Sequence, residues 1–332
     1  MGLVSLFVAV VGVIAGAAGS LAAAVIRPEQ PGALAVGPRG ALYVADPKRQ
    51  QILMRLPDGS FRVIAGTGRA GFSGDSGPAI DAELRDPEGM TVSTNGTLYF
   101  ADEGNNRVRE ITPDGRIHTI AGDGRFGWVK GGTRALKASI GSPNDVALNP
   151  DGLLYIAASN EILSLNTDGT LTRIAGNRHY EGAYGVGGLA VNASPDGPGG
   201  LAFSRSGDLF MAGLNTKALL MIDRSGTMRT PIGMTGFYPR GRGGIVTTHT
   251  GKVVAIQTQT IVTLTPTSMK TIYNFSGRRI AGIRGFLPNG LAVSPSGTIY
   301  TDTDTDKGNG WASGTAIVAI NPNHTVSVLW TH

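Results

Sequence analysis

Short apolar runs separated by turn residues recur along most of this chain. The clearest unit runs from Pro87 to Gly122. Asn95-Gly96 and Asp114-Gly115 interrupt it, and such dipeptides supply the positive φ angles that tight hairpins need. We therefore predict an antiparallel meander of four strands for each unit. The four apolar runs of this unit are Gly89–Ser93, Thr97–Asp102, Arg107–Thr112 and Ile117–Gly122.

The same pattern is repeated before and after this unit, at intervals of about 55 residues. Similar units begin at Pro31, Pro143, Pro198 and Pro288, and a degenerate copy without the leading proline covers Gly244 to Phe275. These copies together predict six four-stranded units.

A ring is the architecture that this repeat favours. The second apolar runs, such as Leu42–Ala45 and Leu98–Ala101, are apolar on both faces, as expected for sheets packed between two neighbours. A four-stranded unit cannot bury both faces alone, whereas a ring of units can. We predict an all-β fold, a six-bladed β-propeller over residues 27–332. Because the last unit has its own fourth run, Thr325–Trp330, the ring can close by face packing.

Composition excludes several kinds of chemistry. The chain has no cysteine, so disulfides, thiolate zinc sites and cysteine nucleophiles are ruled out. Its net charge of +5 is modest for 332 residues. The arginine clusters are interpreted as solvated surface, and no nucleic-acid partner is predicted, because no recognition motif accompanies them. These clusters are Arg240 with Arg242, and Arg278 with Arg279 and Arg284.

Residues 1–26 form a separate segment with no charged side chain. The run is long enough to cross a bilayer, and Ala22-Ala23-Ala24 offers small residues of the kind that a signal peptidase accepts. The positive residues that usually precede such a run are missing, so a cleaved signal peptide and a membrane anchor both stay open. Either alternative predicts an extracytoplasmic protein, secreted or anchored, with membrane contact only through residues 1–26.

The loop and strand sequences GTGRAGFSGDSGPAIDAELRD and LYFADEGNNRVREI resemble the NHL repeat. The resemblance covers Pro31 to Trp330 and is strongest in the first three units. It implies a propeller, and the families that share this ring include extracellular sensors, protein-binding and RNA-binding scaffolds, and metal-dependent enzymes of the lactonase-like or lyase type. The resemblance is therefore specific for the repeat and leaves the function open.

The resemblance also implies where a site would lie. In propellers of this type the residues before each first strand surround the mouth of the central channel, and the lactonase-like enzymes hold a metal there. The candidate ligand-binding residues are Glu88, Asn144, Asp145 and Asn289, whose oxygens suit a hard divalent cation. The alternative, which we favour, is that these side chains cap local backbone amides.

A second candidate is the acidic segment TDTDTDKGNG, with Asp302, Asp304 and Asp306. It resembles a calcium loop, but the twelfth position from Asp302 is Ser313, whereas the helix-loop-helix calcium site needs glutamate there. A looser calcium site and a solvated acidic loop are the two alternatives. No cofactor is predicted, and calcium or a similar divalent cation is the alternative.

These observations favour a binding, scaffold or sensor domain that acts through its channel-mouth face. The expected partner is a protein, a peptide or a cell-envelope polymer. The alternative is a metal-dependent lactonase-like hydrolase or lyase with a divalent cation in the channel. Whether the protein is an enzyme is left open, because the sequence contains no recognisable catalytic set.

Overall fold

The structure is a computed structural model that describes residues 26, 28–177, 185–195, 197–213, 219–231, 244–280, 283–284, 287–303 and 315–331. The predicted signal or anchor segment lies outside these residues except for Ile26, and Asp304 and Asp306 also lie outside them. Within the described ranges, no helix combines the length and the apolar composition that crossing a membrane requires.

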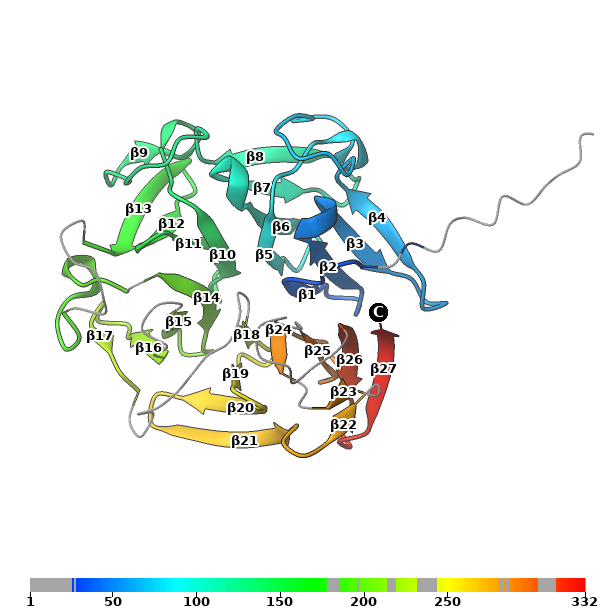
Figure 1. Cartoon of the computed structure of the whole chain (residues 1–332). Helices are drawn as coiled ribbons and strands as arrows, with labels where there is room; N and C mark the ends of the chain where they lie inside the picture. Colours follow the sequence, from blue (N-terminus) through cyan, green and yellow to red (C-terminus); the bar gives the residue numbers. More distant parts are fainter. Residues whose placement is uncertain are drawn as a thin grey trace, which may run out of the picture.

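The described residues form six antiparallel sheets arranged as the blades of a ring (Figure 1). In each sheet the four main strands are hydrogen-bonded in the order of the sequence. The predicted six-bladed propeller is therefore confirmed. The strands of the first three blades are β1 Leu34–Val36, β2 Leu42–Asp46, β3 Gln51–Arg55 and β4 Phe61–Ala65; β5 Pro87–Val92, β6 Leu98–Asp102, β7 Arg107–Ile111 and β8 Ile117–Ala121; and β10 Pro143–Leu148, β11 Leu154–Ala158, β12 Glu161–Leu165 and β13 Thr170–Ala175.

The last three blades repeat the same order, including the degenerate unit, which forms blade 5. Two small additions were not predicted: β9 extends blade 3, and β22 pairs with β23 between blades 5 and 6. The strands are β14 Pro198–Phe203, β15 Leu209–Gly213, β16 Leu219–Ile222 and β17 Met228–Arg229; β18 Ile245–Thr247, β19 Val253–Gln257, β20 Thr260–Thr265 and β21 Ser268–Asn274; β24 Pro288–Val293, β25 Ile299–Thr303, β26 Ala316–Ile320 and β27 Val326–Thr331; and β9 Thr133–Arg134, β22 Arg279–Ile280 and β23 Ile283–Arg284.

Short 3₁₀ helices lie in the connections. Three of them lie between blades, and each of these begins with a fully or almost fully buried alanine, Ala79, Ala135 or Ala190. The small alanine side chain lets the loop pack against the blades, while the residue that follows the alanine faces solvent. The 3₁₀ helices are η1 Pro47–Arg49, η2 Ala79–Asp81, η3 Glu103–Asn105, η4 Ala135–Lys137 and η5 Ala190–Asn192.

The hairpin turns differ in one detail from the prediction. In the turn between β5 and β6, Gly96 has a φ of 92°, whereas Asn95 is not among the residues of positive φ. The Gly96 amide donates to the Ser93 carbonyl at 2.9 Å, so the turn spans four residues. Glycine alone therefore supplies the left-handed conformation, because the longer turn needs it at one position only.

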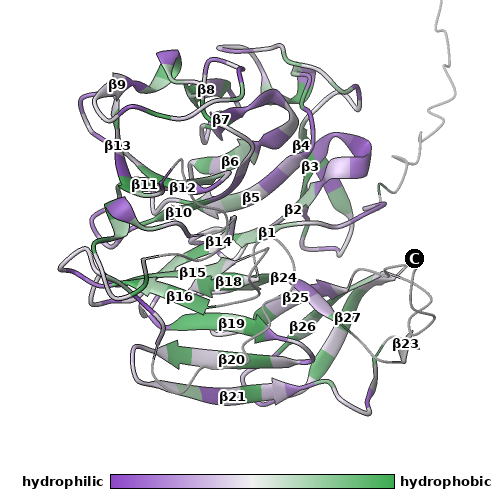
Figure 2. Cartoon of the chain, turned by 60° about the vertical axis from the view of Figure 1, so that its left-hand side comes forward, coloured by the Kyte–Doolittle hydropathy of each residue, from purple (hydrophilic) through white to green (hydrophobic). Residues whose placement is uncertain are grey.

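Each hydrophobic core lies between two blades rather than inside one. Leu98 and Phe100 of blade 2 pack with Ala33 and Ile52 of blade 1, for example. Figure 2 shows apolar strands within the blades and more polar loops around the rim. This arrangement explains why the strands are apolar on both faces, and it makes each blade depend on its neighbours for stability.

The ring closes between blade 6 and blade 1. Trp330 of β27 and Ile317 of β26 lie in one buried cluster with Leu34, Val44 and Leu53 of blade 1. The sheet of blade 6 consists of β24, β25, β26 and β27 among the described residues, so it takes no strand from the N-terminus. Closure by face packing is thus confirmed.

Candidate functional site

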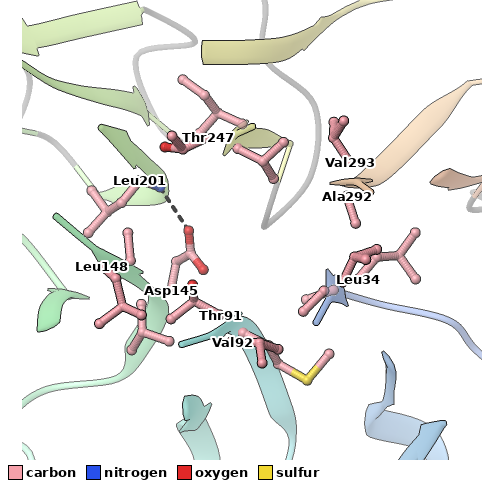
Figure 3. A pocket seen from close by; sticks show the side chains of 17 residues that line it. Leu34, Thr91, Val92, Asp145, Leu148, Leu201, Thr247, Ala292 and Val293 are labelled. Atoms are coloured by element: carbon pink, nitrogen blue, oxygen red, sulfur yellow. Dashed lines mark hydrogen bonds between the residues drawn. The ribbon is translucent and has the colours of Figure 1, made fainter. Parts of the chain in front are cut away.

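The first strands of the blades surround a central channel that contains a cavity of about 130 Å³. Its walls are mainly aliphatic and come from blades on all sides, including Leu34, Val92, Leu148 and Val293 (Figure 3). Asp145 is the acidic side chain among the lining residues, and it comes from the beginning of β10. The described lining is therefore a narrow apolar space with the Asp145 carboxyl group near its mouth.

Asp145 lies between three blades. Its Oδ2 accepts a hydrogen bond of 2.8 Å from the amide of Leu201 in blade 4, shown as a dashed line in Figure 3. The side chain of Asp145 is buried, with 4% of its surface exposed. A backbone donor from the neighbouring blade thus fixes its orientation in the ring.

The position of Asp145 depends on a glycine in the blade before it. A Cβ atom on Gly89 of blade 2 would lie 2.5 Å from Asp145 Cα and closer still to Asp145 Oδ1. Real Cβ contacts of that length do not occur, so any larger residue at 89 would displace the carboxylate. Gly89 and Asp145 therefore form a complementary pair across the interface of blades 2 and 3.

Burial raises the pKa of Asp145 to about 7, because the charged form loses its hydration. Hydrogen bonds from the amides of Leu201 and Val146 act in the opposite direction, and the nearby Glu88 carboxylate raises the pKa further. A carboxyl group that exchanges its proton near neutral pH can act as a general base or a general acid.

The structure brings three of the four predicted channel-mouth residues together. Glu88 is close enough to Asp145 for its charge to raise the pKa of that residue. Asn144 is buried beside Asp145 in β10. Asn144 Nδ2 donates to the carbonyl of Pro198 in blade 4 at 3.3 Å. Asn289 lies in β24 of blade 6, three blades away from Asn144. Asn144 contacts a backbone carbonyl of the next blade, not a local amide, which differs from the local capping that we favoured.

Asp302 lies in a different environment from the one predicted. It belongs to β25 and is fully buried, whereas the sequence suggested an acidic loop. Its Oδ1 accepts from the Gly290 amide at 2.5 Å. The reason is that β25 pairs with β26 as far as Thr303 and Ala316, beyond the apolar part of the run. A cation-binding role for this segment stays a prediction, because Asp304 and Asp306 are outside the described residues.

The donor set at the mouth is small for a metal ion. Among the described residues, no three histidine, cysteine, aspartate or glutamate side chains are grouped so that they could hold a metal. Glu88, Asp145 and the amide of Asn144 offer oxygens, whereas calcium takes six to eight. These residues can supply part of a coordination shell, with the rest from water, backbone or ligand.

One signal in the sequence distinguishes Asp145 from the equivalent residues of the other units, and our prediction did not use it. At the third position of each proline-led unit, the other blades have Ala33, Gly89, Gly200 and Gly290. Blade 3 alone among them has a side chain larger than a methyl group there. Comparison of the aligned units would therefore have identified Asp145 as the exceptional residue of the ring, although its contact with Leu201 requires the three-dimensional structure.

Comparison with known proteins identifies the family. The sequence profile of the family described as "Phytase-like: Esterase-like activity of phytase" matches residues 32–229, which is more than half of the chain. The chain belongs to the phytase-like family. The matched part of this phytase-like chain covers the first four blades and so includes Glu88, Asn144 and Asp145.

Curated relatives are much longer than this phytase-like chain. Teneurin-3 of Mus musculus is 30% identical over 204 residues, which are 54% of the chain and 7% of the teneurin. Teneurin-m of Drosophila melanogaster is 27% identical over 212 residues, which are 57% of the chain and 8% of that protein. The chain thus spans less than a tenth of the length of these two relatives.

Solved structures with the same fold include two enzymes. The virginiamycin B lyase from Staphylococcus aureus has a TM-score of 0.55 at 14% identity, over 91% of this chain and 84% of the lyase chain. A gluconolactonase from Xanthomonas campestris has a TM-score of 0.56 at 16% identity, over 82% of both chains. At these identities the similarity shows the shared propeller fold.

Proposed function

We propose that this phytase-like propeller is an extracytoplasmic binding domain of the NHL type, secreted or tethered by residues 1–26, that holds its partner on the channel-mouth face. The partner is a protein, a peptide or a cell-envelope polymer. The observation that carries the proposal is the size of the channel. Its cavity of about 130 Å³ is smaller than the roughly 300–1,000 Å³ of usual small-molecule pockets. A ligand of ordinary size that binds at this end therefore lies across the mouth and does not enter the channel.

The residues at the mouth suit such surface binding. Glu88 is half-buried beside buried Asp145 and Asn144, and polar groups with a fixed orientation are what a specific surface contact requires. The fold similarity to other propellers supports the architecture of this face but leaves the partner to experiment.

A binding experiment on the full chain tests this proposal. We would screen immobilised peptides and cell-envelope glycans, and compare the wild type with the triple variant Glu88→Ala, Asn144→Ala, Asn289→Ala. The expected result is that the triple variant loses at least tenfold in affinity for the selected probe. The matched control is Lys270→Ala in the exposed outer strand β21. Equal binding by the triple variant would exclude the mouth as the binding surface.

A second candidate function is hydrolysis of an ester or a lactone, and a specific observation favours it. Asp145 has a pKa raised to about 7 and faces the cavity, so it can accept a proton from an attacking water. The esterase-like description of the family agrees with this reaction. If a divalent cation takes part, Glu88, Asn144 and Asp145 would hold it, and it would polarise the carbonyl of the substrate.

Hydrolysis of aryl esters and of sugar lactones by the full chain, with and without added calcium, tests this candidate. Asp145→Asn should lower kcat by about 10²- to 10⁴-fold, the usual contribution of a general base. Asp114→Asn, in an exposed hairpin turn, should leave the rate unchanged. If neither substrate class is hydrolysed, the enzymatic candidate is wrong and the binding proposal stands alone.

A further inference from the structure

The end of the channel opposite to the mouth opens into a second and larger cavity. It has a volume of about 730 Å³ and is lined by the turns between the first and second strands of blades 2, 3, 4 and 5. This volume lies within the range of typical ligand pockets. Thr91, Val92, Leu148 and Thr247 line both this cavity and the channel, so the floor of the turn-side cavity is the end of the channel.

The sequence of these turns differs around the ring, and at one turn position blades 4 and 5 have basic side chains. The second residue of the four-residue turn is proline in blades 1, 3 and 6, but Thr94, Arg205 and His249 in blades 2, 4 and 5. Arg205 and His249 both line the cavity and come from adjacent blades. Asp151, from the blade on the other side of Arg205, also lines it.

Hydrogen bonds join the turns of blades 4 and 5, and they fix the two turn backbones relative to one another. The Arg205 amide donates to the Gly251 carbonyl at 2.8 Å. Thr247 Oγ1 accepts from the Phe203 amide and donates to the Phe203 carbonyl, both at 2.8 Å. A site whose walls are hydrogen-bonded before the ligand arrives loses less conformational freedom on binding.

Gly251 makes this close approach feasible. Its φ is +75°, a conformation that L side chains rarely adopt, and a Cβ there would lie 2.5 Å from Arg205 Cβ. Replacement by alanine would therefore push the blade 5 turn away from Arg205. The residue offers a way to disturb the cavity without removing any charged group.

The chemistry of the wall specifies one class of ligand. An arginine binds a carboxylate or a phosphate through paired hydrogen bonds, and an aspartate accepts hydrogen bonds from adjacent hydroxyl groups. The rest of the cavity wall carries hydroxyl and amide groups. The floor of the cavity is apolar and includes Leu148 and Phe203. The polar lining residues include Ser93, Thr94, Asn149, Ser204, Thr248 and Thr250.

We propose that the turn-side cavity binds an acidic sugar, a mono- or disaccharide with at least one carboxylate or phosphate group. Arg205 and His249 contact the acidic group, and Asp151 accepts hydrogen bonds from sugar hydroxyls. This site is separate from the channel mouth and does not depend on the function proposed for that face.

Titration calorimetry on the full chain tests the proposal with three probes: digalacturonate, glucose 6-phosphate and neutral digalactose. At least one acidic probe should bind ten times more tightly than the neutral one, and comparing the two acidic probes identifies the preferred acidic group. Arg205→Ala should weaken this binding by about tenfold, as expected for the loss of a charge-assisted hydrogen bond. Gly251→Ala should weaken it as well.

The matched control is Arg39→Ala, because Arg39 is an exposed arginine in the corresponding turn of blade 1 and does not line the cavity. It should bind like the wild type, and so should the triple channel-mouth variant. Circular dichroism melting checks that each variant is folded. The proposal is overturned if no acidic probe binds, if the neutral sugar binds equally well, or if Arg39→Ala weakens binding as much as Arg205→Ala.

Discussion

Two buried aspartates, Asp102 in blade 2 and Asp145 in blade 3, show how the same side chain serves different purposes in one ring. Asp102 is fully buried and ends β6, whereas Asp145 lies near the start of β10 at the channel mouth. Burial raises the pKa of both, to about 6 for Asp102 and about 7 for Asp145. What differs is the set of partners.

Asp102 has a cation and two further donors. Its oxygens accept from the Arg85 amide and from Asn105 Nδ2, each at 2.8 Å, and Arg109 Nη1 lies 3.5 Å from Oδ2. Arg109 is also fully buried and donates to Asp75 at 2.9 Å. This network connects the loop before blade 2 to strands β6 and β7, so its role is structural.

Asp145 has backbone donors and a second acid, Glu88, in its surroundings. Among the described residues that line its cavity there is no arginine or lysine. The comparison teaches that burial alone does not identify a functional carboxylate. A compensating cation makes Asp102 part of the framework, whereas backbone amides alone leave Asp145 able to exchange a proton near pH 7.

The largest effect should come from breaking the network of Asp102. Arg109→Ala leaves a buried carboxylate without its cation, and removal of one partner of a buried ion pair costs about 3–5 kcal/mol. Urea unfolding measures this loss of free energy. Arg116→Ala is the control, because its ion pair with Asp114 is exposed and such pairs contribute about 0–1 kcal/mol. Similar losses in both variants would contradict a structural role for the network.

A smaller effect is expected from crowding Asp145. In Gly89→Ala the new methyl group overlaps Asp145, and overpacking of this kind costs about 1–3 kcal/mol. Gly131→Ala is a matched control, because a Cβ there meets nothing within 4 Å. Urea unfolding of both variants at pH 7 provides the measurement. If Gly89→Ala proved as stable as Gly131→Ala, the close fit between blades 2 and 3 would be refuted.

The two aspartates also show how far the sequence can be interpreted. The blades were predictable because a fixed period, paired apolar runs and turn glycines are all local signals. Asp145 was noticed only as the neighbour of Asn144, although aligned units mark it as exceptional. Its contact with Leu201 joins residues 56 positions apart, and no local pattern specifies that.

Other features were beyond the sequence for similar reasons. Arg109 was included in the motif that resembles the NHL repeat, but its burial depends on how the loop from Ser73 to Glu83 folds over it. Asp302 was assigned to a loop because polar residues follow an apolar run, yet hydrogen bonding to β26 extends the strand through it. In both cases tertiary pairing decides what a local pattern cannot.

The smallest effect concerns the pH dependence of stability, and it separates the two aspartates directly. The folded-state pKa of Asp145 is about 7, above the ordinary value near 4, so the folded protein binds the additional proton. Stability from this group is present in full below about pH 4 and is lost as the pH rises through 7. Between pH 6 and pH 8 the loss should be about 1 kcal/mol.

Asp145→Asn should remove most of that loss between pH 6 and 8. It should also remove about half of the fall in stability between about pH 4 and pH 6, leaving the half that comes from Asp102 and its pKa of about 6. Urea unfolding at half-unit pH steps resolves the two windows. Asp58→Asn is the control, because hydrogen bonds from Ser60 lower the pKa of this exposed residue and confine its effect to acid pH. A variant Asp145→Asn that still lost stability above pH 6 would show that another group titrates there.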